Sequence, residues 1–260
     1  MKIQYLLRTI GKPLVKFITK LGELSLFIFN SITSGIKPPY HCKMLFKQMI
    51  EIGFYSFPVV GLTTIFAGMV LALQTYSAIG NLGAESAVAS VVIVSITREL
   101  GPVLAGLMVA GRIGASMAAE IGTMRVTEQI DALRTLSTNP YQYLIWPRIL
   151  ASVLVLPILV FVGDIIGVYG GYVVGVYKLD FNPANYITNT WNSLEMMDVY
   201  VGLVKAAAFG FIISLMGCYH GYKSKGGAQG VGAATTNAVV SASILILTFN
   251  YVITELFFAK

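Results

Sequence analysis

The chain has 260 residues, of which 56% are hydrophobic and only 12% charged, and its mean hydropathy is +0.74. Soluble domains carry about 25% charged residues, so this composition excludes an ordinary water-soluble globular protein. The net charge of +6 does not indicate nucleic-acid binding, because eight of the 18 basic residues precede residue 50, ahead of the first long apolar run, as in membrane proteins that follow the positive-inside rule.

Residues 1–49 form an N-terminal segment that we expect to lie at the cytoplasmic membrane surface. Basic residues recur at every fourth position: Arg8, Lys12, Lys16 and Lys20. In a helix they would form one stripe, with Leu14, Phe17, Ile18, Leu21 and Leu24 on the other side. Pro13 suits a first helical turn, so the helix should begin near it. A basic amphipathic helix of this kind lies in the headgroup region of a bilayer. The alternative is a solvated helix packed on the protein's own cytoplasmic face.

Residues 50–260 form the predicted transmembrane domain. Five apolar stretches are long enough to span a bilayer, at about residues 50–76, 86 to beyond 114, 143–177, 200–222 and 235–258. Pro58 and Gly61 would kink the first stretch or make it partly re-entrant. The predicted fold class is therefore an all-α polytopic helix bundle with about five transmembrane helices, preceded by the interfacial helix.

The loops predict one orientation. Residues 119–139 and the segment around Lys223 and Lys225 carry basic residues, whereas the turn at 80–83 has none and the loop at 178–198 has only Lys178. Basic residues are enriched on the inner side, so the N-terminus should lie inside and the C-terminus outside.

Four glycines recur at every fourth position of the third predicted span: Gly163, Gly167, Gly171 and Gly175. This spacing strips one helix face of side chains, and helices in lipid pack closely on such faces. The spacing favours close packing, within the chain or across a homodimer.

Arg98 and Glu99 interrupt the second span, three to four residues before Pro102. Charges at bilayer depth cost a few kcal/mol each and need partners or a polar cavity. Pro102 should kink the helix and free the carbonyl of Arg98. We expect the pair to lie at a substrate cavity; the alternative is a structural ion pair in which Asp164 or Glu255 is the partner of Arg98.

Asp164, within the third span, is a second candidate for the same cavity. Lys205 and Glu255 lie near the outer ends of their spans, where long side chains reach the interface, so no functional role is expected of them.

The charged segment 119–139 predicts a docking element. Thr127 suits the N-cap of a short helix and Glu128 suits its first turn, while Val126, Ile130 and Leu133 share one face. Such a helix fits a groove of a cytoplasmic partner. An ordinary solvated connection is the alternative.

Residues 120–133, EIGTMRVTEQIDAL, closely resemble the cytoplasmic signature of the MlaE/YrbE permeases of ABC-type lipid transport systems. TRELGPVLAGL at 97–107, AGRIGA at 110–115 and GVGAATTNAVV at 230–240 resemble the same family. The resemblance covers nearly the whole chain.

The resemblance implies a homodimer in the bacterial inner membrane, with a cytoplasmic N-terminus and a periplasmic C-terminus. It implies two cytoplasmic ATPase subunits, a periplasmic MCE-domain partner and phospholipid as the substrate moved between inner and outer membranes. A small cytoplasmic STAS-domain protein is a further candidate partner.

The resemblance also assigns roles to residues. The segment that contacts the ATPase would include Glu120, Arg125, Glu128 and Asp131. Arg98 and Glu99 would lie by the lipid cavity. The chain departs from the family at Ala233 and Asn237, where members often carry basic residues, and this puts the contacts of those charges in doubt.

The remaining motifs limit the chemistry. The glycine-rich turn at 226–232 lacks the Lys-Ser/Thr of a phosphate-binding loop, so energy must come from a partner that binds ATP and Mg, or from an ion gradient. An ion-driven secondary transporter using Glu99 or Asp164 as a proton site is the alternative function. A lipid-modifying enzyme is disfavoured, because His41 and His220 stand alone and no catalytic or metal-binding pattern occurs; we expect no cofactor on this chain.

Overall fold

The computed structural model describes residues 2–79 and 84–258, with side chains from residue 15 onward in the first helix, Phe17 excepted, and from residue 86 onward in the fourth. The predicted turn at 80–83 lies outside the described residues. Every secondary-structure element of the described residues is a helix, and five helical stretches are long and apolar enough to cross a membrane: Cys42–Ile79, Ser86–Val126, Tyr141–Tyr177, Met196–Tyr222 and Gly227–Phe258.

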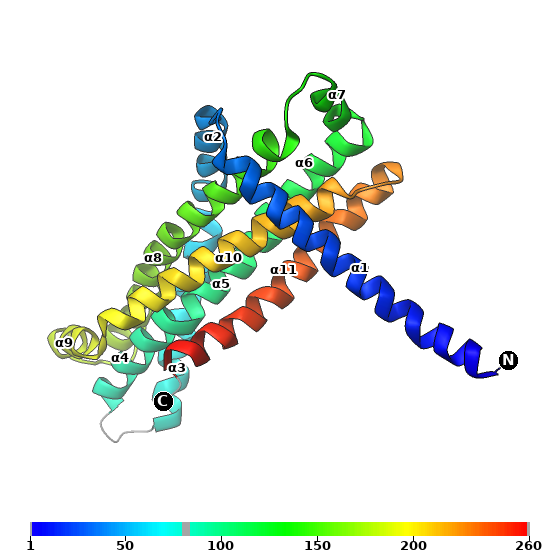
Figure 1. The fold of residues 1–260 in the computed structure, drawn as a ribbon. Helices are drawn as coiled ribbons and strands as arrows, with labels where there is room; N and C mark the ends of the chain where they lie inside the picture. Colours follow the sequence, from blue (N-terminus) through cyan, green and yellow to red (C-terminus); the bar gives the residue numbers. More distant parts are fainter. Residues whose placement is uncertain (1, 80–83, 259–260) are drawn as a thin grey trace.

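The N-terminal segment forms one helix, α1 (Lys2–Ile36), which does not begin at Pro13 as predicted. Its N-terminal part projects away from the bundle, and its C-terminal part crosses the helices at one end (Figure 1). Several apolar side chains of the described part are exposed, including Val15, Ile18 and Phe29. No described part of the chain covers these side chains, which is what a helix that met a membrane surface with its apolar face would show.

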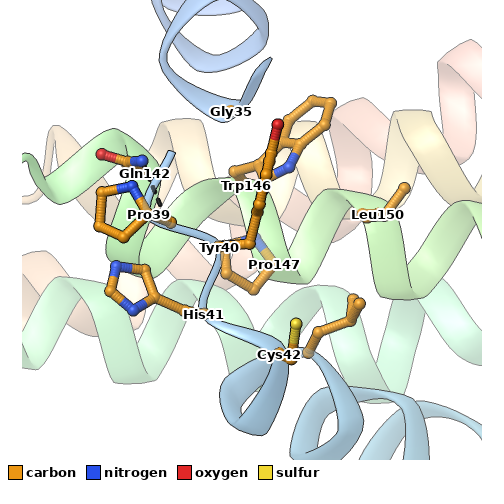
Figure 2. A pocket seen from close by; sticks show the side chains of 10 residues that line it. Gly35, Pro39, Tyr40, His41, Cys42, Gln142, Trp146, Pro147 and Leu150 are labelled. Carbon is orange, nitrogen blue, oxygen red and sulfur yellow. Dashed lines mark hydrogen bonds between the residues drawn. The ribbon is translucent and has the colours of Figure 1, made fainter. Parts of the chain in front are cut away.

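A short linker joins α1 to α2 (Cys42–Gly53), and Gln142 fastens it to the bundle. Gln142 Nε2 donates to the carbonyl oxygens of Lys37 and Pro39, at 2.5 and 2.9 Å. Figure 2 shows this contact beside a small pocket of about 180 Å³, where Gly35 faces the Trp146 ring.

The first span is interrupted by a turn just before Pro58, rather than kinked at it. It consists of α2 and α3 (Phe57–Ile79), separated by a turn at residues 54–56, and the predicted boundary at 49/50 falls within α2. α3 alone has 23 residues, about 34 Å of helix, which is enough for a bilayer core of about 30 Å.

The second span contains two π-helical turns. It runs through α4 (Ala84–Ser95), η1 (Ile96–Leu100), α5 (Gly101–Val109), η2 (Ala110–Gly114) and α6 (Ala115–Val126). Such turns commonly mark functional positions in helices, and η1 contains the Arg98–Glu99 pair immediately before Pro102. After α6 the chain bends into the short α7 (Gln129–Thr135).

The third span comprises η3 (Tyr141–Ile145) and α8 (Trp146–Tyr177), which packs chiefly on α3 and α10. α9 (Pro183–Ser193) covers its far end, and Asn182 caps α9 by accepting from the amides of Ala184 and Asn185. α10 (Met196–Tyr222) lies at the centre of the bundle, and α11 (Gly227–Phe258) packs on α10 and α6 (Figure 1).

The segments predicted to be inside gather at one end of the molecule. Figure 1 places α1, α2 and α7 there, with α9 and the C-terminus at the opposite end. Two contacts join these segments at that end. Arg134 of α7 donates to the hydroxyl of Tyr222 at the end of α10, and Lys223 pairs with Glu23 of α1.

Candidate functional site

The first π-helical turn of the second span, η1, and α10 together carry four charged side chains, which we call the η1 cluster: Arg98, Glu99, Asp198 and Lys205. Arg98 Nε lies 2.5 Å from Oδ1 of Asp198, and Lys205 Nζ lies 2.9 Å from Oε1 of Glu99. Asp198 and Lys205 both come from α10 and are fully buried. Their charges cancel, which removes the cost of placing each one alone in a membrane.

Pro102 explains how Lys205 is held. A proline cannot donate to the carbonyl four residues earlier, so it leaves that of Arg98 without its helical partner. Lys205 Nζ donates to this oxygen at 2.8 Å. The lysine therefore replaces the missing backbone hydrogen bond and neutralises Glu99 at the same time.

α11 completes the cluster. Asn250 Nδ2 donates to Oε2 of Glu99 at 2.7 Å, and Thr254 Oγ1 donates to Oε1 at 2.8 Å. The Arg98 guanidinium lies 4.5 Å from the centre of the Phe258 ring, a cation–π contact. Arg98 and Glu99 remain about one-third exposed, so both charges can be reached from the surface of the bundle.

Two predictions about these charges were wrong. Arg98 pairs with Asp198 rather than with Asp164 or Glu255, because α10 begins at Met196 and brings residue 198 into the bundle instead of leaving it in the outer loop. Lys205 does not reach outward to the interface, since Glu99 and the freed carbonyl bind it inside the bundle.

Asp164 lies apart from the η1 cluster. Its carboxyl oxygen Oδ1 lies against Gly101 of α5. The side chain lines a pocket of about 710 Å³ between α4, α8, α9 and α10. The structure thus brings Arg98 and Glu99 together with α11, whereas Asp164 lies in the wall of this pocket, against Gly101.

The predicted coupling residues lie where α6 bends into α7. Arg125 Nη1 donates to both carboxylate oxygens of Asp131, at 2.8 and 2.9 Å, and holds the bend closed. Glu120 pairs with Arg148, the buried arginine at the start of α8. Glu128 has a left-handed backbone with φ of 60°, and its exposed carboxylate has no ion pair within the described part of the chain.

Thr127 is not the N-cap of α7. Its hydroxyl donates back to the Thr123 carbonyl at 2.9 Å, because the residue closes α6 instead. The apolar face that was predicted to dock in a partner is partly used within the chain, since Ile130 is fully buried. Glu128 is the predicted coupling residue that remains available to a partner.

The four-residue glycine repeat packs within the chain. A methyl group on Gly163 or Gly167 would meet α3, and one on Gly171 or Gly175 would meet Val92 of α4 or Tyr186 of α9. The alternative left open by the sequence, a glycine face across a homodimer, does not apply to these positions.

Arg112 is a functional candidate that the sequence did not single out. From η2, its Nη1 donates to Oγ of Ser56 at 2.8 Å and to the carbonyl of Glu51 at 3.3 Å, where the first span is broken. A charged residue within a predicted span was the signal that could have found it. Among the described residues no group of His, Cys, Asp and Glu is arranged to hold a metal ion.

Comparison with known proteins places these features in a family. The family described as permease MlaE matches residues 45–256. A probable ABC transporter permease protein of Rickettsia felis is 60% identical over 250 residues, 96% of each chain. One from Synechocystis is 41% identical over 212 residues, 82% of this chain and 81% of its own.

A further relative is the intermembrane phospholipid transport system permease protein MlaE of Haemophilus influenzae, which is 32% identical over 250 residues, 96% of each chain. The matched region contains all five candidate spans almost completely, together with the η1 cluster and the α6–α7 bend. This chain belongs to the MlaE permease family.

Proposed function

We propose that this chain is the membrane-spanning permease subunit of an ABC-type system that moves phospholipids between the inner and outer membranes of a bacterium. The η1 cluster is the observation that carries the proposal. It presents one partly exposed cation and one partly exposed anion inside an otherwise apolar bundle. A zwitterionic phospholipid headgroup offers the complementary pair, a phosphate for Arg98 and an ammonium for Glu99.

A second copy would enclose the lipid cavity. α11 leaves an apolar seam exposed at Val240, Ile244, Leu247 and Tyr251, which share one helix face. The same helix exposes Thr236, Asn237 and Thr248, polar side chains that are unfavourable against lipid tails. A homodimer that meets along α11 would cover both sets and place the two η1 clusters beside a shared cavity.

The energy would come from a partner. In this proposal a cytoplasmic ATPase binds ATP and Mg and contacts the α6–α7 bend, chiefly at Glu128. A periplasmic MCE-domain protein receives or delivers lipid at the α9 end, and a STAS-domain protein remains a candidate regulator. The N-terminus would then be cytoplasmic and the C-terminus periplasmic, and this chain would catalyse no reaction itself.

The test is purification of the tagged chain from its native membrane, followed by identification of its protein and lipid partners. Reconstituted vesicles should then transfer a fluorescent phosphatidylethanolamine to acceptor vesicles only when ATP is present. Complexes without an ATPase, or transfer that ignores ATP, would refute the proposal.

One observation favours an ion-driven transporter instead. Asp164 is a buried carboxyl group without an ion pair among the described residues, as a proton site requires. That mechanism predicts lipid transfer that is abolished by an uncoupler and unaffected by loss of the ATPase.

A further inference from the structure

A pocket beside Asp164 adjoins η1 through Thr97, but none of the four η1-cluster residues lines it, and we call it the flank pocket. It occupies about 710 Å³, within the range of about 300–1,000 Å³ in which proteins hold small ligands. Its lining is apolar and aromatic, with Phe161, Tyr169, Tyr172, Tyr186 and Trp191 among its members, and includes no lysine, arginine or histidine. A charged phosphate would therefore find no cation inside it.

Buried polar atoms in its wall lack partners. Tyr186 is 1% exposed and Asp164 is 8% exposed, yet the hydroxyl of the first and Oδ1 of the second have no hydrogen-bond partner among the described residues. An unsatisfied buried polar group costs about 1–3 kcal/mol. Burial also raises the pKa of Tyr186, which lies in the loop helix α9, to about 12, so its hydroxyl stays protonated and can donate to a ligand.

The flank pocket has the depth of one leaflet. Its lining on α8 runs from Phe161 to Tyr172, a rise of eleven residues or about 16 Å of helix, close to half of a bilayer core of about 30 Å. The middle of the third span, Tyr141–Tyr177, falls at residue 159. The pocket thus extends from mid-membrane to the α9 end.

Its mouth faces the surrounding bilayer. Phe161, Ile165 and Tyr169 of the lining are exposed on α8, and Trp191 of α9 is 70% exposed above them. Tyrosine and tryptophan at the end of a span are typical of the headgroup boundary. A molecule in the adjacent leaflet can therefore enter sideways.

We propose that the flank pocket holds one acyl chain of a phospholipid from the leaflet at the α9 end, with the Tyr186 hydroxyl donating to its ester carbonyl. The headgroup stays outside at the level of Trp191, because the pocket offers it no cation. Since Asp164 in the wall lies against Gly101, directly after η1, an occupied pocket keeps water away from this π-helical turn. This site goes beyond the proposed transport function, because a protein that transfers no lipid would still bind there.

The test uses the full-length chain in nanodiscs of phosphatidylethanolamine and phosphatidylglycerol that contain a phosphatidylethanolamine with a diazirine in one acyl chain. After illumination, mass spectrometry should find the label concentrated on residues 161–172 and on α9. Thr190→Trp fills the pocket and should lower this labelling about tenfold, since displacing two or more methylenes costs that much binding. Ile158→Trp, at an exposed position of α8 outside the pocket lining, should leave it unchanged.

Tyr186→Phe keeps the ring and removes the donor, so it should lower labelling severalfold while the protein elutes as a single folded species. Equal labelling of the exposed residues Leu154 and Ile158 would overturn the proposal, because it would mean lipid contact without a pocket. Labelling by a diazirine fatty acid but not by the diazirine phospholipid would also overturn the proposal. So would labelling that Thr190→Trp and Tyr186→Phe both leave unchanged.

Discussion

Arg148, fully buried at the start of α8, lies with Nη2 2.7 Å from Oε2 of Glu120 on α6, although the two groups lack the alignment of a hydrogen bond. The pair joins the second span to the third at the end of the bundle that carries α7. A residue that the family resemblance places at the ATPase contact therefore also holds the bundle together.

Glu120→Gln should destabilise the protein. It leaves the Arg148 guanidinium buried without a counter-charge, and because Glu120 is half exposed the cost should be about 1–3 kcal/mol, below that of a fully buried pair. We expect the midpoint of thermal unfolding in detergent to fall by at least about 3 °C. Glu128→Gln is the matched control and should not change it; equal midpoints for the two variants would contradict the structural role of the pair.

At Glu128 the effect of the side-chain charge can be measured separately from the effect of the left-handed backbone. A left-handed backbone disfavours side chains by about 1–2 kcal/mol, so Glu128→Gly should stabilise the bend, whereas Glu128→Lys should not. If the carboxylate contacts the ATPase, both variants should lower ATP-driven lipid transfer, by about tenfold for each 1.4 kcal/mol lost. Normal transfer by both, in complexes with full ATPase content, would remove Glu128 from the coupling surface.

The sequence was sufficient to predict the five spans and the charged residues Arg98, Glu99 and Asp164 within them, because these follow from local hydropathy. It could not identify the partners of those charges. Asp198 and Lys205 lie about a hundred residues beyond Arg98 and Glu99, and their pairing depends on where α10 begins and how it packs. The predicted start of α7 was wrong for a similar reason, since Thr127 suits an N-cap locally but closes α6 in the structure.

Lys205→Met should lower the stability of the folded protein. It leaves Glu99 without its cation and the carbonyl of Arg98 without a donor, at a cost of about 3–5 kcal/mol. The double variant Glu99→Gln with Lys205→Met removes both charges and should recover most of the stability but not lipid transfer. Recovery of transfer as well would show that the pair is structural only.

Exchange of Arg98 and Asp198 tests the other pair. Arg98→Asp with Asp198→Arg keeps one ion pair at the same place but moves the partly exposed cation from η1 to a buried position on α10. Yield and oligomeric size should approach those of the unmodified protein, while transfer of phosphatidylethanolamine in proteoliposomes should stay at least tenfold lower, as expected when a charged contact is lost. Full transfer would mean that Arg98 serves the fold alone.

The glycines of α8 face either backbone or side-chain atoms of α3, and the two cases predict different losses of stability on substitution. A methyl group on Gly167 would lie 3.1 Å from the backbone oxygen of Thr64, which cannot move without shifting α3, so Gly167→Ala should cost about 1–3 kcal/mol. A methyl group on Gly163 would meet the side chains of Val60 and Thr64, at 3.2 and 3.4 Å, which can adjust by rotation. Gly163→Ala should therefore cost less than about 1 kcal/mol.

Gly22→Ala is the control for helix propensity, because nothing lies within 4 Å of the added methyl group, and it should stabilise α1 by about 0.5–1 kcal/mol. Thermal unfolding of the three variants in one detergent should place Gly167→Ala lowest and Gly22→Ala highest. If Gly163→Ala and Gly167→Ala lose the same stability, the backbone of α3 yields as easily as a side chain, and close helix contact at Gly167 is not what holds α3 on α8.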